Sequence, residues 1–156
     1  MKHFIMLIGI PCSGKSTFTE KYTKTGNFAV ISSDNIIEEM AKEKNTTYSN
    51  IFKDAIGVAN KTMLEQARKA FDNNENVIWD QTNLNIKSRR AKLVMVPSHY
   101  YKTAIIFNAP DEAELKRRLN NRPGKNIPLH IINSMTDSFE TPTESEGFNS
   151  IFCNLL

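Results

Sequence analysis

The sequence predicts an α/β fold, a parallel sheet of about five strands with helices on both faces, and three observations support it. Short apolar runs typical of buried strands alternate with longer stretches of helical periodicity. A glycine-rich loop at residues 9–16 directly follows the first apolar run. No repeat, low-complexity tract or linker divides the 156 residues, so we expect a single domain over residues 1–156.

The first element is an apolar run at residues 3–8, which we expect to form a buried strand. The loop after it reads Gly-Ile-Pro-Cys-Ser-Gly-Lys-Ser, a complete G-x-x-x-x-G-K-[ST] phosphate-binding motif. A helix expected over residues 15–25 follows, and its positive end and the loop's N–H groups would hold nucleotide phosphates. The motif in this context predicts a nucleoside triphosphate site, with ATP and Mg²⁺ as the expected ligands. The expected contacts are Gly9, Pro11, Cys12, Ser13, Gly14, Lys15, Ser16 and Thr17.

Within this loop, two side chains have distinct expected roles. Lys15 would reach the β and γ phosphates, and the Ser16 hydroxyl would ligate Mg²⁺. Both roles require the strand, loop and helix order that the sequence shows. This predicts a catalytic as well as a binding role for Lys15.

The remaining elements alternate in the same way along the chain. Apolar runs predict further strands at residues 28–32, 76–80, 102–107 and 150–153. Helical periodicity and start or stop signals such as Ala-Pro-Asp and Pro97 predict helices over residues 35–42, 51–73, 85–96, 111–121 and 129–139. Right-handed crossovers place the carboxyl ends of parallel strands at one edge of a sheet, where ligands bind. We therefore expect the polar clusters that follow these strands to converge.

One of these clusters is Ser-Ser-Asp at the end of the second strand. Asp34 could accept the proton of an attacking hydroxyl while the γ-phosphoryl group moves in line. The alternative is that Asp34 only caps the following helix, since aspartate is a favoured N-cap. A phosphate-binding loop in the same chain favours the catalytic interpretation, because a phosphotransferase needs a base on the acceptor side.

A second cluster, Asp-Gln-Thr-Asn, follows the third strand. Asp80 could hold the Mg²⁺ shell, or Asp80 and Thr82 could bind the acceptor hydroxyl, with Asn83 as a further substrate contact. Hydrogen bonding within a turn at the strand end is the alternative. Arg89, which follows this loop, could meet an acceptor phosphate, and an exposed helix start is the competing interpretation.

Two arginines are spaced four residues apart near the break at residues 122–128. Arg118 and Arg122 project from one helix face, and on a mobile cover they could clamp the triphosphate and stabilise the transferring phosphoryl group. An exposed basic helix face is the alternative. The Pro-Gly pair after Arg122 favours an arginine-bearing lid.

Composition sets broad limits on the class of protein. The net charge of +3 permits a polyanionic partner without requiring one, because a triphosphate site needs cations of its own. Cys12 and Cys153 have no metal or redox spacing, which indicates free thiols in a reducing compartment. No apolar stretch approaches the roughly 20 residues of a membrane span. We expect a soluble, cytoplasmic protein with no membrane association, and a homo-oligomer is left open.

Taken together, four motifs resemble the 5′-polynucleotide kinases, the P-loop kinase modules of phage and bacterial RNA end-healing enzymes. They are residues 9–17, Ile-Ser-Ser-Asp at 31–34, Asp-Gln-Thr-Asn-Leu-Asn at 80–85 with Arg-Arg at 89–90, and Arg-x-x-x-Arg at 118–122. The resemblance implies transfer of the ATP γ-phosphate to a 5′-hydroxyl of RNA or DNA, with Mg²⁺. It further implies Asp34 as general base, Arg118 and Arg122 on the ATP phosphates, and Asp80 and Thr82 on the acceptor side.

One position departs from the family pattern. The family usually carries an arginine three residues after the base, in contact with the acceptor's phosphate, and this chain has Ile37 there. Isoleucine cannot donate hydrogen bonds to a phosphate. Two alternatives therefore stay open: a P-loop kinase for a small hydroxyl compound such as a nucleoside, nucleotide or sugar, and a nucleotide-binding protein without catalysis.

Overall fold

The computed structural model describes residues 1–154 and contains a five-stranded, entirely parallel sheet with the order β2-β3-β1-β4-β5. The strands are β1 (Lys2–Ile8), β2 (Phe28–Ile31), β3 (Asn76–Asp80), β4 (Tyr100–Phe107) and β5 (Ser150–Asn154). The predicted α/β fold with a parallel sheet of about five strands is confirmed. The central strand, β1, ends in three buried residues and delivers the phosphate-binding loop to the middle of the sheet edge.

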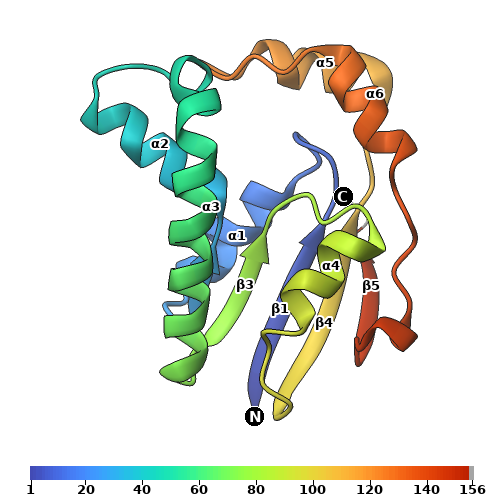
Figure 1. Cartoon of the computed structure of the whole chain (residues 1–156). Helices are drawn as coiled ribbons and strands as arrows, with labels where there is room; N and C mark the ends of the chain where they lie inside the picture. The colour runs from blue at the N-terminus through green and yellow to red at the C-terminus, as the bar shows by residue number, and fades with distance from the viewer. Residues whose placement is uncertain (155–156) are drawn as a thin grey trace.

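Six α-helices within residues 1–154 connect and cover these strands. They are α1 (Lys15–Thr23), α2 (Ser33–Glu43), α3 (Tyr48–Asp72), α4 (Ile86–Leu93), α5 (Glu112–Asn120) and α6 (Leu129–Asp137). A 3₁₀ turn, η1 (Glu144–Glu146), precedes β5. Figure 1 shows α5 and α6 standing above the carboxyl ends of the strands, across from α2 and the start of α3.

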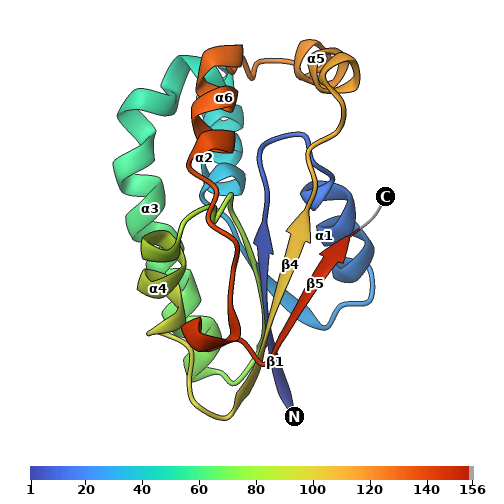
Figure 2. The same ribbon diagram turned by 90° about the vertical axis from the view of Figure 1, so that its right-hand side faces the viewer.

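Helices cover both faces of the sheet, as Figure 2 shows with α1 on one side and α3 and α4 on the other. The first layer consists of Phe18 and Tyr22 of α1 against Leu7, Ile78 and Phe107 of the strands. The second, larger layer consists of Met63, Ala67, Phe71, Leu93 and Val96 against Phe4, Met6, Trp79 and Ala104. These apolar layers hold the strand ends in fixed relation, so the polar groups that follow them are presented on a rigid edge.

A smaller apolar cluster joins α5 and α6 to the sheet edge. It consists of Leu115 and Ile132 from these helices, Ile10 from the phosphate-binding loop and Leu84 from the loop after β3. We refer to residues 112–137 as the lid. The lid is therefore seated on the phosphate-binding loop by buried apolar contacts.

Two helices begin earlier than their apolar periodicity predicts. Helix α2 starts at Ser33 rather than residue 35, because the Ser32 side chain accepts a hydrogen bond from the Asn35 N–H at 3.3 Å and forms the N-cap. Asp34 thus lies in the first turn, and the alternative of an Asp34 N-cap is wrong. Helix α3 starts at Tyr48 rather than residue 51, with Thr47 as its N-cap.

Candidate active site

A cavity of about 1030 Å³ lies at the carboxyl edge of the sheet, beneath the lid. Its walls come from the phosphate-binding loop, α1, the ends of β2 and β3, the start of α2 and the lid. The sequence-predicted residues among its lining are Pro11, Cys12, Gly14, Lys15, Ser16, Thr17, Asp34, Asp80, Thr82, Arg118 and Arg122. The four polar clusters therefore meet in one cavity, as the strand order requires.

The phosphate-binding loop has the backbone form that an anion site needs. Cys12 and Gly14 have φ angles of 66° and 104°, in the left-handed region. Gly14 is the N-cap of α1 without any side-chain cap, so the helix directs its first N–H groups toward the cavity. Gly9 lies behind the loop, where an added Cβ would lie 2.7 Å from Ser13 Oγ and 3.0 Å from Phe107. Ser13 and Phe107 approach the backbone so closely that this position requires a glycine.

Lys15 is buried at the base of the cavity. Its Nζ donates to the carbonyl oxygens of Gly9 and Ile10, at 2.7 and 2.8 Å. Burial lowers the pKa of Lys15 to about 8, and the carboxylates of Asp80 and Asp34 oppose this shift. The partial charges of the two carbonyl oxygens balance the Lys15 ammonium only in part, and a bound phosphate would supply a full negative charge.

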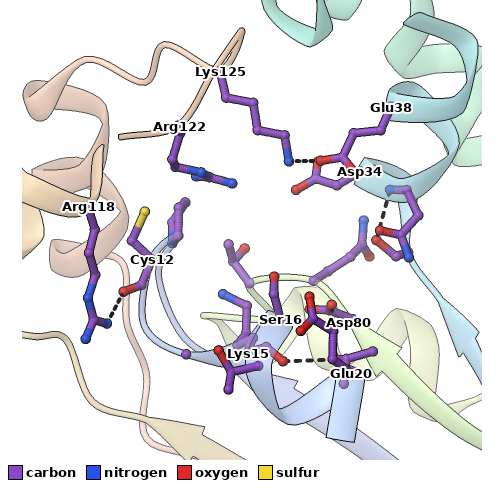
Figure 3. Close-up of a pocket in the computed structure, with 18 of the residues that line it drawn as sticks. Cys12, Lys15, Ser16, Glu20, Asp34, Glu38, Asp80, Arg118, Arg122 and Lys125 are labelled. Atoms are coloured by element: carbon purple, nitrogen blue, oxygen red, sulfur yellow. Dashed lines mark hydrogen bonds and ion pairs between the residues drawn. The ribbon is translucent and has the colours of Figure 1, made fainter. Parts of the chain in front are cut away.

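Ser16 and Asp80 are the candidate metal-binding pair. Both line the cavity, and Figure 3 shows them close to Lys15 at its base. Thr19 donates a hydrogen bond to Asp80 Oδ2 at 3.3 Å, and burial raises the pKa of Asp80, opposed by the charge of Lys15. Mg²⁺ is usually held by one or two protein oxygens together with substrate phosphates. One carboxylate and one hydroxyl beside a phosphate-binding loop fit that pattern.

The two lid arginines have different partners. Arg118 donates to the Cys12 carbonyl oxygen at 2.9 Å and to Glu114 at 2.7 Å, so it ties α5 to the phosphate-binding loop. Arg122 lies in the loop after α5, and its buried Nη1 has no hydrogen-bond partner within the described residues. Figure 3 shows the Arg122 guanidinium pointing into the cavity. A buried, unpaired guanidinium nitrogen is costly unless an anion fills the space beside it.

The opposite wall carries Asp34 and Glu38, one helical turn apart on α2. Tyr48 donates its hydroxyl to Asp34 Oδ1 at 2.6 Å. Glu38 forms an ion pair with Lys125 of the lid. The Lys125 ammonium also lies 4.6 Å from the centre of the Tyr48 ring. This wall is thus a network that connects α2, α3 and the lid.

Two residues predicted as acceptor contacts lie elsewhere. Asn83 is buried: its side-chain amide donates to the Leu7 carbonyl oxygen at 2.8 Å, and Lys92 donates to its Oδ1. Arg89 is fully buried and donates to Glu146 at 2.8 Å and to the Asn83 carbonyl oxygen at 3.0 Å. Both brace the loop after β3, and their burial keeps them from contacting a substrate in this structure.

Sequence reasoning missed several side chains that line or support the cavity. Glu38 could have been found from its four-residue spacing after Asp34 on a predicted helix. Gln81 donates to Ser33 Oγ at 2.8 Å and accepts from the Trp79 indole at 3.1 Å, which fixes the start of α2 beside the end of β3. Lys125 and Tyr48 carry no local signal, because their partners lie far away in the sequence.

This fold and site define a P-loop protein with the kinase type of parallel α/β sheet. Residues 4–142 match the AAA_33 family model, described as an AAA domain, and the chain belongs to that family. Within residues 1–154, none of the helices has the length and apolar character required to cross a bilayer.

Relatives and solved structures agree with this assignment. The chain is 30% identical to L-seryl-tRNA(Sec) kinase of Methanococcus maripaludis, over 88% of this chain and 52% of the relative. It is 26% identical to the bifunctional polynucleotide phosphatase/kinase of Schizosaccharomyces pombe, over 96% of this chain and 33% of the relative. A chain of the Pnkp1/Rnl/Hen1 RNA repair complex superimposes with a TM-score of 0.68 and 25% identity, over 88% of this chain and 43% of that chain. This chain therefore spans about half or less of these proteins.

Proposed function

We propose that this protein transfers the γ-phosphate of ATP to a 5′-hydroxyl end of RNA or DNA, with Mg²⁺. The convergence of the phosphate-binding loop, Asp34, the Asp80–Thr82 segment and the lid arginines in one cavity carries the proposal. The order of these motifs resembles the polynucleotide kinases, and one relative is a polynucleotide phosphatase/kinase. The similarity to a chain of an RNA repair complex supports the same substrate class.

The proposed chemistry divides between the two walls of the cavity. The free N–H groups at the start of α1 and the Lys15 ammonium would hold the β and γ phosphates of ATP. Mg²⁺ at Ser16 and Asp80 would neutralise phosphate charge. Arg122 would stabilise the transferring phosphoryl group, whose transition state carries charge on its outer oxygens.

On the acceptor wall, Asp34 would receive the proton of the attacking hydroxyl. Its first-turn position on α2 leaves the carboxylate exposed toward the cavity. Thr82, near the start of the loop after β3, could orient the acceptor. Proton removal in line with phosphoryl transfer is the role of the aspartate in this type of reaction.

A specific observation favours a second candidate, a kinase for a small hydroxyl compound. Ile37 is fully buried and packs with Ala55 and Ala59 between α2 and α3. The residue that faces the cavity beside it is Glu38, a second carboxylate next to Asp34. A carboxylate repels the phosphates that flank a nucleic acid end, so the acceptor wall suits a neutral acceptor as well.

A panel of acceptors separates these candidates. The protein is incubated with γ-labelled ATP, Mg²⁺ and 5′-hydroxyl oligonucleotides of RNA and DNA, with the same oligonucleotides carrying a 5′-phosphate as matched controls. Nucleosides and sugars are assayed in parallel. We expect label on the 5′-hydroxyl oligonucleotides and none on the controls. Label on nucleosides or sugars, with no transfer to oligonucleotides and no competition by them, would establish the second candidate. ATP binding without transfer to any acceptor would indicate a non-catalytic protein.

A further inference from the structure

A tyrosine from another helix donates a hydrogen bond to the proposed base. The Tyr48 hydroxyl lies 2.6 Å from Asp34 Oδ1, a length typical of a strong hydrogen bond to a carboxylate. Burial and this hydrogen bond raise the pKa of Tyr48, so the phenol stays protonated at neutral pH and acts as a donor. One carboxylate oxygen is thereby engaged, and Oδ2 accepts no hydrogen bond from the described residues.

Several contacts hold Tyr48 in place. It is the first residue of α3, directly after the Thr47 N-cap, whose side chain accepts from the Asn50 N–H at 3.3 Å. Its ring centre lies 5.5 Å from that of Phe52, one turn further along α3. On the other side, the Lys125 ammonium lies 4.6 Å from the ring centre, in the range of a cation–π interaction. The ring is therefore held between α3 and the lid.

The residue after Tyr48 is a docking point for the lid. The Ser49 N–H donates to the Gly124 carbonyl oxygen, and the Asn126 N–H donates to Ser49 Oγ, both at 2.9 Å. Lys125, between these two lid residues, pairs with Glu38 on α2. The contacts that seat the lid are thus adjacent to the contact that holds Asp34.

We infer that Tyr48 is a positioning residue: its hydroxyl fixes the orientation of the Asp34 carboxylate toward the acceptor hydroxyl when the lid is docked. A carboxylate on an exposed first turn would otherwise exchange between staggered χ1 rotamers. One hydrogen bond removes that freedom and leaves the second oxygen for the proton transfer. This inference rests on the proposed function insofar as Asp34 acts as the base.

Tyr48→Phe tests the inference, because it removes the hydroxyl and keeps the ring for Lys125 and Phe52. We expect kcat for phosphate transfer to fall about 10-fold or more, the cost of one hydrogen bond to a charged group, with ATP affinity unchanged. Tyr100→Phe is the matched control: its hydroxyl donates to the Glu75 carbonyl oxygen at 2.7 Å, outside the cavity. Wild-type kcat in Tyr48→Phe, or an equal loss in Tyr100→Phe, would overturn the inference.

A second readout does not depend on any acceptor. Three-bond couplings measured by NMR on the free protein report the χ1 rotamer of Asp34. We expect a single rotamer in the wild type and in Tyr100→Phe, and values averaged over rotamers in Tyr48→Phe. A single Asp34 rotamer in Tyr48→Phe would overturn the positioning role. If the wild type transfers phosphate to no acceptor, the proposed function fails, while these couplings still decide the role of Tyr48.

Discussion

The two walls of the cavity are built in different ways. The phosphate-binding loop of the donor wall is one run of consecutive residues, and Lys15 within it donates to Gly9 and Ile10, six and five positions away. The acceptor wall is assembled from distant segments: Tyr48 meets Asp34 across 14 positions, and Asn126 meets Ser49 across 77. A local sequence motif indicates a chemical role by itself. The role of a wall made of long-range contacts can be inferred only from the folded structure.

The walls also differ in charge. The donor wall presents helix N–H groups and Lys15, which suit the triphosphate of any nucleotide. The acceptor wall presents Asp34 and Glu38, with Lys125 already paired to Glu38. Donor and acceptor functions should therefore be separable in this site, so variants on one wall should leave the other function intact.

The largest expected effect is on the donor wall. Lys15→Ala should weaken ATP binding about 10- to 100-fold, because the phosphates lose a charged hydrogen-bond partner, and should abolish transfer. Calorimetric titration with ATP and Mg²⁺ measures the first effect and the labelled-phosphate assay the second. Lys21→Ala, on an exposed part of α1, is the matched control and should bind ATP as the wild type does. Unchanged ATP affinity in Lys15→Ala would contradict the donor assignment.

The lid also lines the cavity, and its Arg122 should affect the rate more than binding. Arg122→Ala should lower kcat about 100-fold, since a donor to the developing phosphoryl charge is lost. Lys116→Ala, which removes an exposed lid cation paired with Glu112 at 3.0 Å and outside the cavity lining, should leave kcat unchanged. Steady-state rates at saturating ATP distinguish the two variants. Equal effects of both substitutions would show that the lid acts only through its overall positive charge.

The smallest expected effect is a pH dependence confined to the donor wall. Burial lowers the pKa of Lys15 to about 8, so the free protein loses this cation as the pH rises above that value, and ATP affinity should fall by up to tenfold per pH unit. The unfolded chain keeps this proton to higher pH, so the same group favours the folded state as pH rises.

Calorimetric titrations from pH 7 to 9.5 measure this dependence. The Lys15→Ala variant should show no such fall. A wild-type affinity that is constant over this range would contradict the assignment of the titrating group.

The same contrast between the walls explains what the sequence could predict. The parallel sheet, the phosphate-binding loop and the convergence of Asp34, Asp80 and the lid arginines follow from alternating apolar runs and the rule for strand ends. The burial of Arg89 could not be predicted, because its partner Glu146 lies 57 residues away and no spacing in the sequence links the two. The role of Tyr48 was not predicted, because the start of α3 depends on the Thr47 N-cap, which lies in the polar segment between α2 and α3.

The most direct test of two separable walls is a paired measurement on Asp34→Asn, which keeps the size of the side chain and removes its basicity. ATP affinity and the rate of phosphate transfer to a 5′-hydroxyl oligonucleotide are measured on the same preparation, with Asp54→Asn on the exposed face of α3 as control. We predict wild-type ATP affinity and a transfer rate reduced about 10²- to 10⁴-fold, the usual contribution of a general base. Near-normal transfer by Asp34→Asn, or a loss of ATP binding as large as that of Lys15→Ala, would contradict the account.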